Sequence, residues 1–528
     1  MTTADIALDA APPAEPVVTP KLIAAFVALA TGMFMAILDI QIVASSLNEI
    51  QAGLSASSDE IAWIQTAYLV AEIVMIPLTG FLGRALSTRY LFAICAAGFT
   101  LFSVLCAGST SIGEMIIWRA AQGFIGGAMI PVVFSAAFTA FPKDRQAMIA
   151  AIVGLIATLA PTVGPTIGGY LTSTFSWHWL FLINVAPGIA VTIAVLIFVD
   201  FDQPDPSLLR RVDWTGLITL AAFLGSLEYV LEEGAGKDWF NDQVIVNFSI
   251  VAFISAIAFF WRAFTAKEPI VDIRAFADRN FWTGSLFSFV LGVGLYGLVF
   301  LLPIFLARVR GYDAQEIGET VFVTGAFMML AAPIVGGLSP KVDPRLLIGL
   351  GLGLFGLSCF QLVPVTSDWA FWELFVSQAV RGAAMMLCIV PASILALGTL
   401  PPEHVKNASG LFNLTRNLGG AFGLAILTTL LNKRMDLHIE RLHEAVNWAR
   451  SAATEQLATL TQGFSAVPGA DASRQALMVL QNKVRGEALV MAFSDVFLIL
   501  AILFLATVFL VPLARRPRAD AAGAAGGH

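Results

Sequence analysis

Three ionisable side chains, Asp39, Glu72 and Arg119, lie inside long apolar segments of this 528-residue sequence. A charge near the centre of a bilayer costs roughly 2.5–3.5 kcal/mol, so such residues face a cavity or a partner. Burial favours the protonated carboxyl and exposure favours the ionised one, so Asp39 or Glu72 could bind and release a proton. Arg119 keeps its charge and would hold a carboxylate or carbonyl groups. We expect these residues to couple protons or to bind substrate.

Each of these residues also has a plainer interpretation. Asp39 stands late in its segment, where it could simply be solvated, and Glu72 could be a protonated, hydrogen-bonded packing residue. Arg381 and Arg416 are weaker candidates in the second half of the chain. For Glu228 we expect a structural role, because its segment should lie away from the central cavity.

The apolar segments that carry these residues are about twenty residues long, which is the length a helix needs to cross the hydrocarbon layer with its backbone hydrogen bonds satisfied. With 58% apolar and 13% charged residues, the chain could not fold as one soluble core. The sequence predicts an all-α polytopic membrane protein with fourteen spans, at about 22–47, 61–83, 90–108, 113–140, 148–171, 178–200, 214–232, 243–261, 282–306, 316–338, 346–364, 371–399, 408–431 and 490–513.

The distribution of basic residues predicts the orientation of these spans. If the N-terminus is cytoplasmic, seventeen of the 30 Lys and Arg residues lie on the cytoplasmic side and three lie in short outer loops. Seven more lie in one long outer segment and three lie within spans. Since short cytoplasmic loops carry the excess of Lys and Arg, both termini are expected to be cytoplasmic. Residues 1–20 should form a disordered tail, and residues 514–528 a second cytoplasmic tail.

The chain also repeats itself. Residues 77–91 and 333–347 align without gaps and match at Pro, Gly, Leu, Arg and Leu. Two parallel six-helix bundles would produce this pattern, with the substrate site between the halves. We expect one bundle in residues 21–200 and the other in 282–513. Two additional spans would lie between them, within 201–281.

Several short motifs resemble those of one family. In the first span, residues 38–43 read LDIQIV; residues 119–123 read RAAQG; residues 160–169 read APTVGPTIGG; and residues 177–185 read WHWLFLINV. In this order, together with the inserted pair of spans, they resemble the major facilitator superfamily, and within it the fourteen-helix drug:proton antiporters of the EmrB/QacA type. The resemblance implies the major facilitator fold and export driven by a proton gradient. It also favours a functional role for Arg119.

The third motif is expected to act through its small residues. Gly164, Pro165, Gly168 and Gly169 remove side chains and interrupt the helical hydrogen bonds, so two helices can approach closely and one can bend. A hinge or a proton-tight seal would follow; the alternative is close packing alone.

One loop departs from the family pattern. Arg84, followed by Arg89, stands where the family has an aspartate that helps to latch the halves on the cytoplasmic side. Asp343 in the second half could take a related part. The alternative is that Arg84 is only a basic anchor on the cytoplasmic side.

The largest polar segment, 432–489, is expected outside the cytoplasm. Leu437, Leu442, Ala445, Val446 and Trp448 recur at helical spacing, the Pro468–Gly469 pair follows, and a second helix is expected at about 471–486. The segment therefore predicts an amphipathic hairpin. Resemblance to EmrB-type exporters suggests that it docks a periplasmic membrane-fusion adaptor leading to an outer-membrane channel, and a lid on the membrane surface is the alternative.

Together these features predict a bacterial inner-membrane exporter of amphipathic or hydrophobic small molecules in exchange for protons, with multidrug efflux as the expected activity. The alternatives are a dedicated exporter of an endogenous lipid, fatty acid or siderophore, or a membrane sensor or scaffold that transports nothing. No enzyme activity, nucleic-acid partner, metal or other cofactor is expected, because the sequence has no catalytic constellation or GxxxxGK[ST] phosphate loop. The four cysteines should pack as small apolar residues.

Overall fold

The computed structural model describes residues 18–446, 449–465 and 471–516. Most of both predicted tails (residues 1–17 and 517–528) lies outside these residues, as do Trp448 and the Pro468–Gly469 pair. Regular secondary structure in the described residues is helical. The α-helices are α1 Pro20–Ser45, α2 Leu47–Leu54, α3 Ser58–Ala107, α4 Ile112–Gly126, α5 Met129–Thr139, α6 Lys143–Thr174, α7 Trp179–Leu182, α8 Val185–Phe198, α9 Trp214–Gly234, α10 Gln243–Thr265, α11 Arg279–Phe305, α12 Ala314–Leu338, α13 Pro344–Gln361, α14 Phe371–Leu397, α15 Pro402–Ala445, α16 Ser451–Ser465 and α17 Ala472–Val508.

Helix α3 contains two spans. Ser87 has a φ of 71° and a ψ of 160°, which no helical residue adopts. Gly126 lies against both Tyr68 and Phe99, whose rings would be about 46 Å apart along a straight helix. The chain therefore turns back at Ser87. Within the described residues, thirteen helical segments are long and apolar enough to cross a membrane. Because one of them is this hairpin, the predicted fourteen spans are confirmed.

The two halves pack their helices in the same way. In the first half α1 packs on α6, and α3 packs on α4 and α8. In the second half α11 packs on α15, α13 packs on α14 and α17, and α12 packs on α14. Each set joins the first span of its bundle to the fifth, and the third span to the fourth and the sixth. The sequence repeat is thus a repeat of packing, as expected for two bundles of one design.

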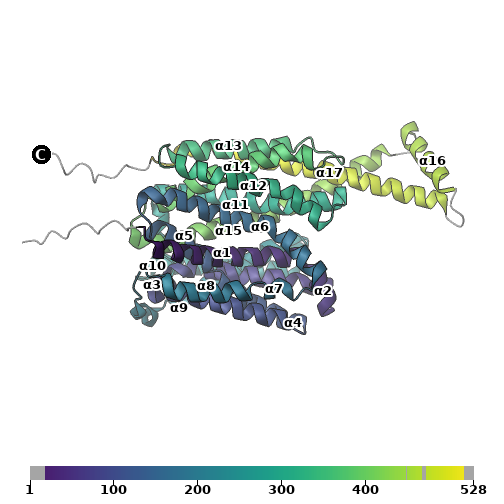
Figure 1. Ribbon diagram of the computed structural model, residues 1–528. Coiled ribbons are helices and arrows are strands. Elements are labelled where there is room, and N and C mark those ends of the chain that lie inside the picture. Colours follow the sequence, from purple (N-terminus) through teal and green to yellow (C-terminus); the bar gives the residue numbers. More distant parts are fainter. Residues whose placement is uncertain (1–17, 447–448, 466–470, 517–528) are drawn as a thin grey trace, which may run out of the picture.

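The halves meet along two seams, which are α6 against α12 and α3 against α15. Figure 1 shows the first half in purple and blue below and the second half in teal and green above. The inserted helices are not spacers beside this assembly. Helix α9 packs on α3, on α15 and on α10, so it lies across one of the two seams.

The two ends of the bundle differ. Helix α1 begins, and α17 ends, at the left end in Figure 1, which we call the termini side. At the right end, which we call the α16 side, α15 and α17 extend beyond the bundle and carry α16. His438 on α15 hydrogen-bonds Asp495 on α17 at 2.8 Å and joins the two extensions. The described residues of the polar segment 432–489 therefore lie in the continuations of α15 and α17 and in α16, and the helix predicted at about 471–486 is the first part of α17.

Candidate functional site

Asp39 and Arg119 form a fully buried ion pair. Arg119 Nη1 lies 2.6 Å from Asp39 Oδ2, and neither side chain is exposed. The guanidinium carbon also lies 4.3 Å from the centre of the Tyr68 ring, in cation–π geometry. The alternative interpretation, that Asp39 is simply solvated near an interface, does not hold, since Asp39 is paired inside the first bundle.

Two amides complete this cluster. Asn184 Nδ2 donates to Asp39 Oδ1 at 2.7 Å, and Gln122 Nε2 donates to the same oxygen at 3.3 Å. Gln122 Oε1 in turn accepts from Arg119 Nη1 at 2.8 Å. The motifs at 38–43, 119–123 and 177–185 thus meet at one point, although they lie up to 145 residues apart in the chain. Arg119 Nη2 is buried without a hydrogen-bond partner, so the cluster has one donor free.

The glycines of the 160–169 motif hold α6 against the segment of α1 that follows Asp39. A Cβ at Gly164 would collide with the Cβ of Gln41. A Cβ at Gly168 would lie 2.9 Å from the backbone oxygen of Ile42 and 2.6 Å from the hydroxyl of Ser45. Pro165 and Gly169, half-buried, lie in the same helix. The motif therefore positions the ion pair by close packing between two helices of the same half.

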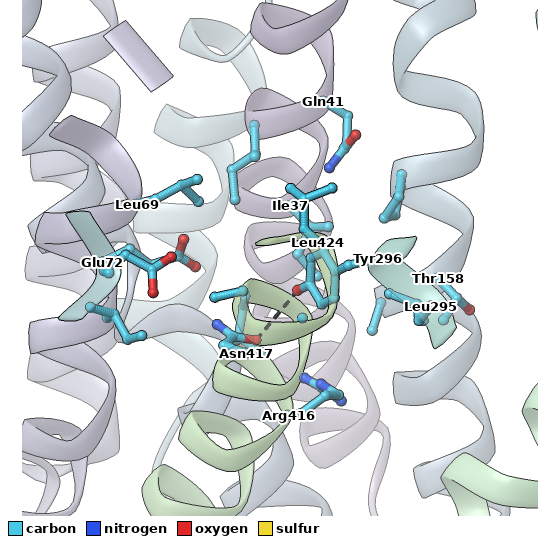
Figure 2. Close-up of a pocket in the computed structure, with 18 of the residues that line it drawn as sticks. Ile37, Gln41, Leu69, Glu72, Thr158, Leu295, Tyr296, Arg416, Asn417 and Leu424 are labelled. Atoms are coloured by element: carbon cyan, nitrogen blue, oxygen red, sulfur yellow. Dashed lines mark hydrogen bonds between the residues drawn. The ribbon is translucent and has the colours of Figure 1, made fainter. Parts of the chain in front are cut away.

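A central cavity of about 90 Å³ lies beside this cluster, between the halves. Figure 2 shows Glu72 on one side of it, Tyr296 and Leu295 on the other, and Arg416 and Asn417 below. The remaining wall is mainly apolar, and isoleucine is its most frequent residue. Tyr296 donates its hydroxyl hydrogen to Asn417 at 3.3 Å. A drug-sized ligand needs roughly 300–1,000 Å³, so this conformation is closed around the cavity.

Glu72 reaches this cavity from α3 and is only 5% exposed. Among the described residues it has no ion pair and no hydrogen bond from its carboxyl group, unlike Asp39. The two carboxyls therefore have different surroundings: Asp39 is fixed in an ion pair, and Glu72 faces the central cavity.

The expected position of Glu228 is wrong. Glu228 and Glu232, both on the inserted helix α9, line the central cavity together with Glu72. Their spacing of four residues places them on one face of the helix. The position of Glu228 alone does not show which side of the bundle α9 occupies. Glu232, a second acid one helical turn away, was the available signal that α9 has an acidic face.

The two second-half arginines occupy different environments. Arg381 is buried and donates to Thr324 Oγ1 at 2.8 Å and to Gln378 Oε1 at 3.3 Å, while its Nη1 has no partner. No carboxylate pairs with it in the described part of the chain. Arg416 lines the central cavity, donates to Asn413 Oδ1 at 2.5 Å and lies 4.9 Å from the Phe134 ring centre.

On the termini side, Asp202 supplies a carboxylate close to the loop where Arg84 replaces the family aspartate. Asp202 accepts from the backbone N–H of Thr88 and pairs with Lys406 on α15. Lys406 also donates to the backbone oxygen of Gly83 at 3.1 Å. This cluster joins the two halves. Arg84 itself is exposed. No motif or local pattern pointed to Asp202.

The other charged residues of these loops stay within their own halves. Arg89 donates to the backbone oxygen of Val199 and lies 3.0 Å from Asp200. Asp343 pairs with Arg345 at 2.8 Å and lies 3.8 Å from Arg516. The suggestion that Asp343 takes the part of the missing aspartate is therefore not supported by its contacts.

Comparison with known proteins identifies the family. The sequence profile of the Major Facilitator Superfamily matches residues 23–424. The chain belongs to this superfamily of transporters, as its motifs predicted.

Among curated proteins the chain is similar to bacterial export and resistance proteins. It is 41% identical to the colistin resistance protein EmrB of Acinetobacter baumannii, over 92% of this chain and 95% of that protein. It is 29% identical to the multidrug export protein EmrB of Escherichia coli K12, over 97% and 99% of the two chains. It is 28% identical to the fatty acid resistance protein FarB of Neisseria gonorrhoeae, over 93% and 96%.

Solved structures agree on the fold. The human organic anion transporter MFSD10 aligns with a TM-score of 0.55 at 13% identity, over 92% of this chain and all of that one. An inward-facing bacterial homologue of the lysosomal transporter Spinster aligns with a TM-score of 0.54 at 17% identity, over 95% of this chain and all of the other. At these identities the likeness concerns the fold alone.

Proposed function

We propose that this protein is a proton-coupled exporter of amphipathic small molecules in the inner membrane of a bacterium. The observation that carries this proposal is a pair of acidic sites in the first half: the buried Asp39–Arg119 pair and, beside it, Glu72 facing the central cavity. Membership of a transporter superfamily and relatives named for drug, colistin and fatty acid resistance support it.

The mechanism assigns different tasks to the two carboxyls. Glu72 takes a proton when the cavity is dry and loses it when the cavity opens to water, because solvation favours the ionised form. Asp39 stays bound to Arg119, and a proton arriving there would release the guanidinium and loosen the contact between α1 and α4. Each protonation thus changes the relative stability of the two open states, which is what exchange of substrate against protons needs.

The orientation that fits the basic loops has the termini side in the cytoplasm. The Asp202–Lys406 cluster then closes the cytoplasmic end in the described conformation. The α16 side would lie in the periplasm, where the extensions of α15 and α17 are placed to meet an adaptor protein. Dedicated export of a fatty acid is the second candidate, favoured by the similarity to FarB and by the mainly aliphatic cavity wall.

Everted membrane vesicles energised by a pH gradient test the proposal. The wild-type protein should export an amphipathic dye, Asp39→Asn should abolish gradient-driven transport, and Glu72→Gln should reduce it at least tenfold. Lys21→Gln, which removes an exposed partner of Asp200, serves as the control and should transport normally. Wild-type vesicles that move neither dye nor fatty acid would contradict the proposal.

A further inference from the structure

We propose that the inserted helix α9 forms one wall of the substrate site, and that Glu228 and Glu232, together with Glu72, select amphipathic cations. This inference rests on the proposed function, because it names the charge class of the exported substrate and the residues that recognise it. It assigns a role in substrate recognition to α9, the first of the two inserted helices.

Helix α9 is positioned by contacts with α3 and α15. Its half nearer the α16 side packs on α3, where Trp63 stacks on Tyr229 with ring centres 5.2 Å apart and Thr66 donates to Glu233 at 2.9 Å. Trp239, just after α9, donates to Thr429 on α15 at 2.8 Å. Helix α9 therefore contacts both halves and closes the seam between α3 and α15 on the side of the cavity.

Two acidic side chains of α9 face the central cavity. A helix that faced only lipid and its neighbour α10 would have no reason to bury carboxyls. Glu228 is 6% exposed, lines the cavity, and has a buried carboxyl oxygen, Oε2, without a hydrogen-bond partner. Glu232 lines the same cavity one helical turn away. Both acids thus lie where a ligand in the cavity would contact them.

The charged side chains of the cavity wall are mainly acidic. Among the described residues, none of Glu72, Glu228 and Glu232 forms an ion pair. The one basic residue of the cavity wall, Arg416, is already held by Asn413 and by the Phe134 ring. When the cavity opens to water and these acids ionise, the one engaged base leaves the cavity short of positive charge. A cation brought by the substrate would supply it, and burying a charge is favourable only when it is paired.

The rest of the cavity wall is mainly apolar. Side chains such as Leu69, Ile73 and Leu424 surround the acids, and Tyr296 presents an aromatic ring. Apolar surface next to a desolvated carboxylate suits a molecule with a delocalised or alkyl-shielded positive charge. A strongly hydrated ion would lose more on leaving water. The site therefore fits amphipathic cations and disfavours anions of the same shape.

The test compares tetraphenylphosphonium with tetraphenylborate, which share a shape and differ in charge. Purified wild-type protein should bind the phosphonium at least tenfold more tightly than the borate. In the double variant Glu228→Gln/Glu232→Gln, phosphonium binding should weaken at least tenfold while borate binding stays the same or improves. Glu233→Gln is the matched control, since Glu233 is on the same helix but pairs with Lys237 at 3.6 Å and does not line the cavity.

Three results would overturn the inference: wild-type protein that binds neither ion or does not distinguish them, a double variant that binds the phosphonium normally, or a double variant that loses both ions equally. Glu232→Asp, which keeps the charge, should retain phosphonium binding and guards against misfolding of the double variant. Transport separates this inference from the proposed function. If a pH gradient drives phosphonium export equally in wild type and double variant, the inference fails alone. If binding is charge-selective but no gradient drives export, the proposed function fails alone.

Discussion

At the scale of single residues, two of the buried arginines in the described chain have different partners. Arg119 neutralises Asp39, whereas Arg381 lies among neutral groups in the described chain. Breaking a buried pair by removing one partner costs about 3–5 kcal/mol, because it leaves an uncompensated charge.

Replacement of each arginine by methionine should therefore have unequal effects. Arg119→Met leaves the carboxylate of Asp39 buried without its cation, so we expect a loss of stability of about 3–5 kcal/mol. Arg381→Met removes an unpaired buried charge and should cost much less, despite the loss of the hydrogen bonds to Thr324 and Gln378. Thermal melting of the two purified variants in detergent measures the difference, and equal shifts in melting temperature would disprove this account of the pair.

Sequence reasoning found the paired residues but not their state. Asp39 and Arg119 were identified from their charge inside apolar spans, and the motifs at 119–123 and 177–185 contain Gln122 and Asn184. That the four side chains meet depends on how α1, α4 and the α7–α8 region pack, which no local pattern encodes. Likewise, Glu228 was misplaced because the side of the bundle on which α9 lies is decided by its contacts with α3 and α15.

At the scale of helices, the close approach of α6 to α1 depends on Gly168. An alanine Cβ there would lie 2.9 Å from the backbone oxygen of Ile42, which cannot rotate away. We expect Gly168→Ala to push the helices apart and to cost about 1–3 kcal/mol, as overpacking does. It should also reduce transport by displacing Asp39.

The control for this substitution is Gly353→Ala in α13, where an added Cβ would meet nothing within 4 Å. Because alanine is the better helix former by up to about 1 kcal/mol, this variant should be as stable as wild type or more so. Melting temperature and vesicle transport, measured for both variants, test the argument. A harmless Gly168→Ala would mean that the motif does not work by close packing.

The start of α13 should respond to pH through Asp343. This carboxylate caps the helix by accepting from the Arg345 N–H at 3.0 Å and binds the Arg345 guanidinium at 2.8 Å. The bonds from the Arg345 side chain, and then its backbone N–H, hold the pKa of Asp343 below its ordinary value. The stabilisation is therefore present above the unfolded-state pKa of about 3.9 and is lost as pH falls through the folded-state pKa.

Asp343→Asn keeps an oxygen that can cap the helix but loses the ion pair with Arg345, so it should destabilise the protein by about 0.2–1 kcal/mol at neutral pH. The gap between variant and wild type should shrink as the pH approaches 3. Melting curves of both proteins in detergent between pH 7 and pH 3 provide the measurement. A gap that stays constant or widens toward acid pH would show that the ionised carboxylate is not the stabilising form.

At the scale of the whole molecule, contacts between the two halves join them on the termini side. Lys406 on α15 binds Asp202 and the Gly83 carbonyl, and Ser409 donates to the Pro131 carbonyl at 2.6 Å. With the aspartate of the family loop replaced by Arg84, Asp202 from the connection after α8 supplies the negative charge. We expect its loss to favour opening of this side.

The reporter for opening is Ser409→Cys, a fully buried position next to this contact. In this background Asp202→Asn should raise the rate of N-ethylmaleimide labelling about tenfold, because a change of about 1.4 kcal/mol shifts an equilibrium by that factor. Asp343→Asn, which removes a carboxylate of the same side without a bridge between halves, should leave the rate unchanged. A labelling rate that does not change with Asp202→Asn would show that this ion pair does not hold the halves together.

The number of spans and the two-bundle plan followed from the sequence because each depends on a long-range regularity, which is the recurrence of apolar segments and the repeat of residues 77–91 at 333–347. Details of single elements did not follow so well. The helix expected at about 471–486 is present, but α15 and α17 reach it as uninterrupted continuations of span helices, and α16 was not predicted. The end of an apolar run marks the end of a span, but a helix can continue into polar sequence until a residue such as glycine or proline ends it.

The central claim is exchange of an amphipathic substrate against protons, and proton movement driven by the substrate tests it most directly. Purified protein would be reconstituted in proteoliposomes that enclose a pH-sensitive dye, with no initial pH gradient, and an outward gradient of tetraphenylphosphonium would be imposed with the membrane potential clamped. Exchange predicts that protons enter as the cation leaves, that the lumen becomes acidic, and that Asp39→Asn abolishes the acidification. Efflux of the cation without any change of internal pH would contradict the account.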